Sequence, residues 1–215
     1  IGAKHVLYTL GELLLDPGDV IVFPVPYWTT YLDLAEILDL KAKLLPCSSD
    51  QHYKLTPAQL DAALPGAKVF LFNNPSNPTG MVYTEQEIAA LADVLVRHPH
   101  VWIICDDIYN RMVFDGVGYH NFVTFRPELR DRVIFLDSLS KTYGMPGWRV
   151  GFMAGPEVVA NAVVTMNSNH ITNIPELTTA AAVAALTGPQ DVPEAKNAEF
   201  QHKRDEVVAA FAAIP

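Results

Sequence analysis

The sequence predicts an α/β fold of three layers, in which a mainly parallel central sheet is covered by helices on both faces. Three observations predict it. Short apolar segments that suit strands alternate along the chain with segments of helical periodicity. The strand segments are apolar throughout, which is typical of strands buried on both faces of a sheet. Half of the 215 residues are hydrophobic, which is enough to fill a sizeable core and excludes global disorder.

The expected helices are marked by apolar stripes and by the residues that begin and end them. The first stripe includes Val6 and Leu10, and the turn at residues 16–19 ends that helix. Residues 56–57, Thr-Pro, have the form of a helix start, and residues 84–87 form a capping box ahead of an amphipathic helix. Further helices are expected at residues 32–40, 157–166, 176–186 and 194–214.

The strand segments place polar residues at one edge of the sheet. Strands are expected at residues 20–23, 42–45, 68–72, 101–105, 133–136 and 150–154. In open parallel sheets the ligand site lies outside the carboxyl ends of the strands. Polar clusters follow directly on expected strands at residues 73–80, 106–109 and 138–141. This coincidence predicts a ligand site at that edge.

The composition excludes several classes of protein. A formal charge of -9, from 24 acidic and 15 basic residues, makes nucleic acid and anionic membranes poor partners. No apolar run approaches the roughly 18–20 residues of a membrane span. Cys47 and Cys105 cannot build a disulfide framework and fit a reducing compartment such as the cytoplasm. The histidines show no metal-ligand spacing, and no glycine-rich nucleotide fingerprint follows any expected strand.

Two features bear on domain organisation. Residues 1–190 are expected to form one α/β domain, and the Gly and Pro residues between 187 and 193 mark its boundary. Residues 191–215 are expected to begin a long helix that leads to a further domain. The chain does not start with Met, and it stops inside an apolar helical pattern. We therefore expect it to be a piece of a longer protein, truncated at its N-terminus and lacking most of a C-terminal small domain.

The cluster around Lys141 carries the first chemical signal. Lys141 follows directly on an expected strand, Ser138 and Ser140 precede it, and Arg149 follows in a glycine-broken loop. A lysine amine can form a Schiff base with an aldehyde. Hydroxyl groups, an arginine and free backbone N–H groups suit a phosphate. Together they suit an aldehyde that carries a phosphate, and pyridoxal 5'-phosphate (PLP) is such a molecule.

The other clusters fit the same cofactor. Asp106, at a strand end, can keep the pyridine nitrogen of PLP protonated. Tyr109 and Asn77 can bond the phenolic oxygen of the ring, and Trp28 can stack on its face. The start of the first helix, residues 2–4, offers backbone N–H groups to the phosphate.

Four motifs occur in an order that points to one family. They are Pro26-Tyr27-Trp28 with Tyr31, Asn73-Asn74-Pro75-Ser76-Asn77-Pro78-Thr79-Gly80, Asp106-Asp107-Ile108-Tyr109, and Ser138-x-Ser140-Lys141 with Arg149-x-Gly151. In these motifs residues 2–151 resemble the large domain of a fold-type I PLP-dependent aminotransferase of the class I/II group. Each motif alone is weak, but all of them in order are specific.

The resemblance implies roles for individual residues. Lys141, Asp106 and Tyr109 are expected to be catalytic: Lys141 as the Schiff-base lysine that moves the substrate proton, Asp106 at the pyridinium nitrogen, and Tyr109 at the phenolic oxygen. Asn77 is expected at that oxygen and at the substrate carboxylate. The phosphate ligands implied are Gly2, Ala3, Lys4 through its backbone N–H, Ser138, Ser140 and Arg149.

The resemblance also implies an activity and partners. It implies amino-group transfer between an amino acid and a 2-oxo acid by a homodimer, and no metal. Two functional groups of the family, a carboxylate-binding arginine and a partner-subunit tyrosine, fall outside this chain. Asp107 stands where the family usually has glutamate. Two alternatives stay open, a PLP-dependent carbon–sulfur β-lyase on the same fold and the effector domain of a transcription regulator, although the residues around Arg149 favour the transaminases.

Overall fold

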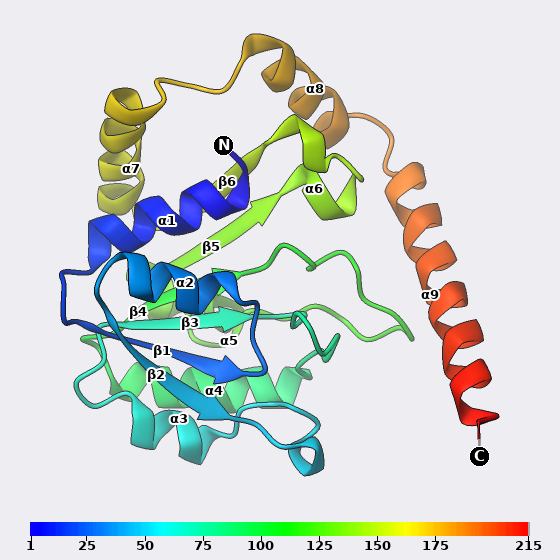
Figure 1. Ribbon diagram of the computed structural model, residues 1–215, viewed down its shortest axis with the longest axis horizontal. Helices are drawn as coiled ribbons and strands as arrows, with labels where there is room; N and C mark the ends of the chain where they lie inside the picture. Colours follow the sequence, from blue (N-terminus) through cyan, green and yellow to red (C-terminus); the bar gives the residue numbers. More distant parts are fainter. Residues whose placement is uncertain (215) are drawn as a thin grey trace.

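The computed structural model describes residues 1–214 and confirms the α/β architecture. Within these residues six strands form one sheet in the order β2-β1-β3-β4-β5-β6 (Figure 1). Their bounds are β1 (Val20–Val25), β2 (Lys41–Pro46), β3 (Val69–Asn73), β4 (Trp102–Asp106), β5 (Val133–Ser138) and β6 (Gly151–Ala154). Neighbouring strands are parallel except β6, which runs antiparallel to β5. Each strand overlaps the segment that its apolar run predicted.

Helices cover both faces of the sheet, as the apolar strands predicted (Figure 1). One layer holds α1 (Gly2–Leu14), α2 (Thr30–Ile37) and α7 (Glu157–His170), and the other holds α3 (Pro57–Ala63), α4 (Glu85–Arg97) and α5 (Phe122–Phe125). Alternate side chains of β1 show the division. Ile21 and Phe23 pack into the core beneath α1 and α2, whereas Val22 packs into the core above α3 and α4.

The capping box predicted at residues 84–87 is present, and a second one stands at the helix start predicted at residues 56–57. The Thr84 hydroxyl accepts a hydrogen bond from the N–H of Glu87, and the Glu87 carboxylate accepts one from the N–H of Thr84 at 2.7 Å. Thr56 and Gln59 make the same pair at the start of α3. These reciprocal bonds satisfy N–H groups that have no partner inside the helix. They fix where both helices begin.

The C-terminal part of the chain is helical but contributes little to the core. The helices α8 (Glu176–Thr187) and α9 (Asp191–Ala212) follow α7, and α9 runs along the side of the molecule away from the sheet (Figure 1). We expected this last helix to begin at residue 194, after the Pro193 boundary. It begins at Asp191 instead, because a proline in the first turn lacks only an N–H that has no partner there.

Between residues 1 and 214 no helix has both the length and the apolar character needed to cross a bilayer. Over the same residues no group of three or more His, Cys, Asp and Glu side chains is placed to hold a metal ion.

The topology brings four loops to one edge of the sheet. β1 lies between β2 and β3 in the sheet. The chain that leaves the carboxyl end of β1 goes to β2, whereas the chain that leaves the carboxyl end of β3 goes to β4 on the opposite side. Ligands bind at such a switch point. Because β6 is antiparallel, its first residue, Gly151, lies beside Ser138 at this same edge. The connection from β5 to β6 therefore begins and ends at this edge, beside the segments that follow β1, β3 and β4.

Candidate active site

A cavity of about 330 Å³ opens at this edge and contains most of the predicted site residues. Its lining residues come from α1, from the segments after β1, β3, β4 and β5, and from the loop before β6. They are Ala3, Lys4, Leu7, Trp28, Tyr31, Asn73, Asn77, Asp106, Ile108, Tyr109, Ser140, Lys141, Pro146 and Arg149. Of the residues that the sequence predicted, only Gly2 and Ser138 do not line it. We call it the site cavity.

Asp106 forms the buried end of the site cavity. It is the last residue of β4 and is 4% exposed. Its Oδ2 accepts a hydrogen bond from the Tyr31 hydroxyl at 2.7 Å, and its Oδ1 accepts a long one from the N–H of Ile108 at 3.4 Å. Burial raises the pKa of Asp106 to about 6, although both hydrogen bonds act to lower it. The carboxyl is therefore ionised at neutral pH and titrates within reach of it.

Lys141 enters the site cavity from a short helix directly after β5. This helix, α6 (Leu139–Thr142), is capped by Ser138, whose hydroxyl accepts a hydrogen bond from the N–H of Ser140 at 3.1 Å. The ammonium of Lys141 lies 5.7 Å from the centre of the Tyr109 ring. Ser138 itself is 2% exposed. The observed position of its side chain supports the turn that presents Ser140 and Lys141.

The start of α1 and Arg149 form a positively polarised cradle. Gly2 has φ +74°, and a Cβ there would lie 2.5 Å from Nη2 of Arg149. A Cβ on Gly151 would lie 2.3 Å from the backbone nitrogen of Ala3. The left-handed φ favours glycine at position 2, and the backbone contact requires glycine at position 151 for β6 to approach the first turn so closely. A helix N-terminus beside an arginine suits a small anion such as a phosphate.

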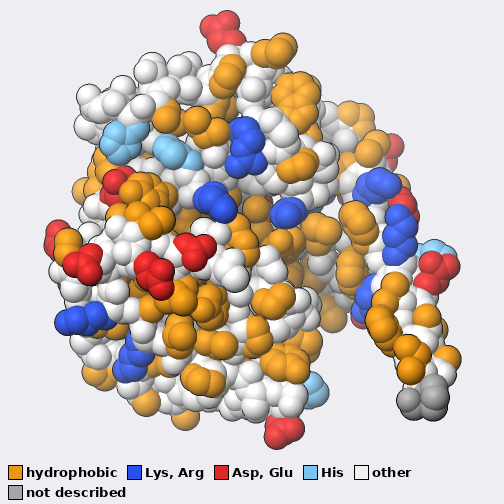
Figure 2. All heavy atoms as spheres, in the orientation of Figure 1, with side chains coloured by type: hydrophobic (Ala, Val, Ile, Leu, Met, Phe, Trp, Pro, Cys, Tyr) orange, Lys and Arg blue, Asp and Glu red, His pale blue; other side chains and the backbone are white. Residues whose placement is uncertain are grey.

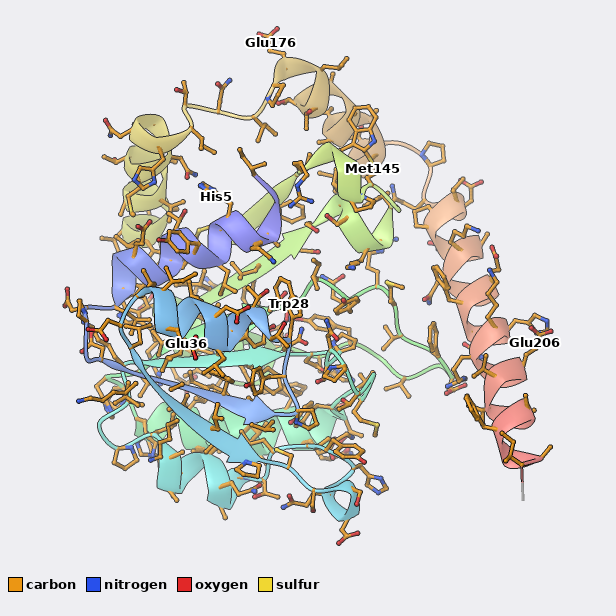
Figure 3. All side chains as sticks on the ribbon, in the orientation of Figure 1. His5, Trp28, Glu36, Met145, Glu176 and Glu206 are labelled. Carbon is orange, nitrogen blue, oxygen red and sulfur yellow. The ribbon has the colours of Figure 1, made fainter. Side chains whose placement is uncertain are left out.

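The opposite wall carries aromatic side chains. Trp28 follows β1, and its ring lies edge-to-face against Tyr31 with centroids 5.7 Å apart. Figure 3 shows Trp28 at the edge of the sheet below the start of α1. The Lys4 ammonium lies 4.8 Å from the centre of the Trp28 ring. The sequence assigned Lys4 only a backbone role, whereas its side chain also faces the site cavity.

The positive groups gather on one face. Figure 2 shows Lys and Arg side chains around the region where the first turn of α1 and α6 lie. Those that line the site cavity are Lys4, Lys141 and Arg149. All three are exposed, so the mouth of the site cavity is cationic and open to solvent, while Asp106 lies at its buried end.

Asn77 and Tyr109 line the site cavity from neighbouring loops. The N–H of Asn77 donates to Oδ1 of Asn73 at 2.7 Å, and the Asn73 amide donates to the carbonyl oxygen of Asp106 at 2.7 Å. Asn73 therefore ties the loop of Asn77 to the end of β4. Within residues 1–214 the side chains of Asn77 and Tyr109 form no hydrogen bond that would keep them from a ligand.

Asp107 lies behind the site. The residue is 5% exposed, and its carboxyl accepts a short hydrogen bond from the Tyr119 hydroxyl. Burial raises the pKa of Asp107 well above its usual range. Asp107, Tyr119, Asn110 and Asp137 line a separate cavity of about 260 Å³. The residue that departs from the family pattern is thus directed away from the site cavity.

Two residues of the site were not given a role by the sequence analysis. Tyr31 was part of a motif, and Asn73 was the first residue of a polar loop. A signal for Asn73 exists, because it and Asp106 end adjacent parallel strands and are partners in register. Tyr31 stands three residues after Trp28, at the start of a helix, which places both side chains near one end of it.

Comparisons with known proteins identify the family of the chain. A family model described as aminotransferase class I and II matches residues 1–215. The aspartate aminotransferase of Rhizobium meliloti (strain 1021) is 38% identical over 214 residues, covering 99% of this chain and 52% of the relative. An aspartate/prephenate aminotransferase of Cereibacter sphaeroides is 41% identical over 209 residues, covering 97% and 52%.

Solved structures give the same result. The crystal structure of the Rhizobium meliloti aspartate aminotransferase superposes with a TM-score of 0.96 at 38% identity, covering 99% of this chain and 54% of that one. A Thermus thermophilus aspartate aminotransferase with maleate superposes with a TM-score of 0.90 at 25% identity, covering 99% and 56%. The chain spans about half the length of the curated relatives that it matches.

Proposed function

This chain belongs to the family of class I and II aminotransferases, and from that premise we propose that its protein transfers an amino group from an amino acid to a 2-oxo acid. Class I and II aminotransferases depend on PLP. One observation carries the proposal: a buried carboxylate, a lysine amine and an anion cradle line a single cavity. Nothing observed favours the β-lyase or the regulator.

The residues present fit PLP. Asp106 would hold the pyridine nitrogen, and Lys141 the aldehyde carbon. Trp28 would stack on the ring, while Tyr109 and Asn77 would bond the phenolic oxygen. The phosphate would bind the cradle, where Gly151 leaves no room for a side chain against the backbone of Ala3. Its ligands would be Gly2, Ala3 and Lys4 through their backbone, with Ser140 and Arg149, and Ser138 would support them by capping α6.

PLP supplies an aldehyde that bonds amines and a protonated ring that accepts the electron pair of the substrate α-carbon. The chain's own residues make this possible. The ionised Asp106 keeps a positive charge on the ring nitrogen, and burial strengthens that pairing. Lys141 would hold the aldehyde carbon when PLP is bound. Its amine, when free, would move a proton to or from the substrate α-carbon.

Aspartate is the amino donor that we propose. The curated relatives are named aspartate aminotransferases or aspartate/prephenate aminotransferases, and the Thermus thermophilus neighbour was solved with maleate, a dicarboxylate. Three cations line the site cavity. Lys141 and Arg149 are assigned to the aldehyde and the phosphate. This leaves the Lys4 ammonium for the second carboxylate of a dicarboxylic substrate.

The full-length protein tests the activity. Incubation with aspartate and 2-oxoglutarate should give glutamate and oxaloacetate in equal amounts, with turnover that depends on both substrates. Release of ammonia and a keto acid from an amino acid without any added 2-oxo acid would indicate an elimination enzyme instead. Binding of PLP without any turnover would favour the regulator.

We further propose a homodimer in the cytoplasm. Helices α7 and α8 expose apolar side chains, among them Val158, Val164 and Leu177, which suit burial against another subunit or domain. Residues 1–190 would form the PLP-binding domain, and residues 191–215 would lead to a second domain, because no residue of α9 is buried. Both cysteines are free, which fits a reducing compartment. Light scattering of the full-length protein measures the subunit number.

A further inference from the structure

Tyr31 reaches the buried end of the site cavity from a distant part of the chain. It is the second residue of α2 and is 2% exposed. Its hydroxyl donates to Oδ2 of Asp106 at 2.7 Å across a sequence separation of 75 residues. The Asp106 carboxylate is therefore bonded by a side chain that lines the same cavity but was assigned no contact with the cofactor.

The Tyr31 ring packs edge-to-face against two other aromatic rings. Phe23 lies edge-to-face at 5.9 Å and Trp28 at 5.7 Å, measured between ring centroids. The N–H of Tyr31 donates to the carbonyl oxygen of Trp28 at 2.9 Å. Burial and the neighbouring Asp106 raise the pKa of Tyr31 well above its usual range, so the hydroxyl stays a donor at every working pH.

Asp106 has few other sources of stabilisation. Its second hydrogen bond, from the N–H of Ile108, is long at 3.4 Å. Within the described residues it forms no ion pair. The titratable and charged groups around it are the carboxyls of Asp107 and Asp137, the hydroxyls of Tyr31 and Tyr109, the thiol of Cys105, and the cations Lys4, Lys141 and Arg149 at the mouth of the cavity. The short bond from Tyr31 is thus the main contact that favours the ionised form.

We propose that Tyr31 is a positioning residue that acts through Asp106: its hydroxyl keeps the carboxylate ionised and oriented for the pyridine nitrogen, while its ring supports Trp28. This inference rests on the proposed function, because the pyridine nitrogen belongs to PLP. Losing a hydrogen bond to an ionised group shifts its ionisation equilibrium by a factor of roughly ten or more. Removing the hydroxyl therefore moves the titration of Asp106 upward by about one pH unit.

The test compares PLP binding by wild-type full-length protein and by Tyr31→Phe between pH 5.5 and 8.5. Quenching of tryptophan fluorescence reports the dissociation constant without any turnover. With titration near pH 6 in the wild type, we expect Tyr31→Phe to bind PLP about fivefold more weakly at pH 6 and less than about twofold more weakly at pH 8.5. Titration of the cofactor phosphate and of other groups cancels in this ratio.

Tyr27→Phe is the matched control. Tyr27 belongs to the same motif and packs edge-to-face on Phe23 with centroids 5.0 Å apart, yet within residues 1–214 its hydroxyl forms no hydrogen bond. This variant should bind PLP like the wild type at every pH. Equal weakening by both variants would overturn the proposal.

A double-mutant cycle shows whether Tyr31 acts through Asp106. In an Asp106→Asn background, Tyr31→Phe should change the dissociation constant by less than about twofold at every pH, because no carboxyl remains to titrate. The same weakening with and without Asp106, or weakening that is independent of pH, would contradict the proposal. Wild-type protein that binds no PLP would instead refute the proposed function, so the two failures are distinguishable.

A second substitution covers the case in which Tyr31→Phe folds poorly. Replacing Tyr31 with 3-fluorotyrosine keeps the ring and makes the hydroxyl a stronger donor. PLP binding should then persist to lower pH than in the wild type. An unchanged pH profile would contradict the proposal.

Discussion

The amide of Asn73 donates to the backbone carbonyl of Asp106 at 2.7 Å, across the last register pair of β3 and β4. The same side chain accepts the N–H of Asn77 at 2.7 Å. One side chain thus joins the strand end that carries the buried carboxylate to the loop that carries Asn77.

Replacing Asn73 tests this connection. Asn73→Ala removes the hydrogen-bond partner of the Asp106 carbonyl oxygen and of the Asn77 N–H. This loss should destabilise the fold by about 1–3 kcal/mol and weaken PLP binding. Asn73→Asp keeps the acceptor for Asn77 and should retain the loop. Urea unfolding and fluorescence titration with PLP measure both effects. An alanine variant as stable as the wild type would show that the bonds contribute nothing.

The cradle should not tolerate a side chain at Gly151. In Gly151→Ala the Cβ would lie 2.3 Å from the backbone nitrogen of Ala3, so the start of α1 must move away from β6. We expect about tenfold weaker PLP binding and roughly 1–3 kcal/mol less stability. Gly147→Ala is the control, since nothing lies within 4 Å of a Cβ there. Equal PLP binding and equal stability of the two variants would contradict the claim that β6 approaches the start of α1 too closely for a side chain.

Asp106 should lower the stability of the PLP-free protein at neutral pH. Its pKa is raised from 3.8 to about 6 by burial, so the folded state binds a proton more tightly than the unfolded state does. This destabilisation is fully present above pH 6 and is relieved as pH falls towards 4.

Asp106→Asn should therefore stabilise the PLP-free protein by roughly 3 kcal/mol at pH 7.5 and by little at pH 4. Urea unfolding at both pH values measures the difference. The Asn side chain still accepts the Tyr31 hydroxyl, so the comparison isolates the charge. A variant less stable than the wild type at pH 7.5 would refute the argument.

Lys4 should decide between substrates of different charge. In Lys4→Met the backbone N–H that we assign to the phosphate is kept and the ammonium is lost. We expect kcat/KM for aspartate to fall about tenfold or more, while kcat/KM for alanine changes little. Steady-state rates on the full-length protein give both values. An equal fall for both amino acids would assign Lys4 to the cofactor instead.

Much of the fold follows from local signals in the sequence. The capping box at Thr84 and the apolar run of β3 are formed by residues that are neighbours in the sequence. The sequence pattern alone therefore predicted both. The start of α9 was misplaced because Pro193 was interpreted as a boundary, although a helix accepts proline in its first turn. A proline at a domain boundary and a proline in the first turn of a helix have the same local sequence pattern, so the pattern does not distinguish them.

The site was only partly predictable. Motifs at strand ends predicted that Asp106 and Lys141 lie close together, because parallel strands bring their carboxyl ends together, and both residues line the site cavity. The bond from Tyr31 to Asp106 depends on how α2 packs over the sheet, which no local pattern encodes. Likewise, the sequence did not show that the carboxyl of Asp107 is directed to Tyr119, behind the site.

The position of PLP tests the central claim most directly. Full-length protein is incubated with PLP, reduced with borohydride and digested, and the modified lysine is located by mass spectrometry. Two lysines line the site cavity, Lys4 and Lys141, and each provides a control for the other. We predict the modification on Lys141 and its loss in Lys141→Ala but not in Lys4→Met. Modification of Lys4, or of lysines outside the site cavity, with Lys141 unmodified would contradict the account.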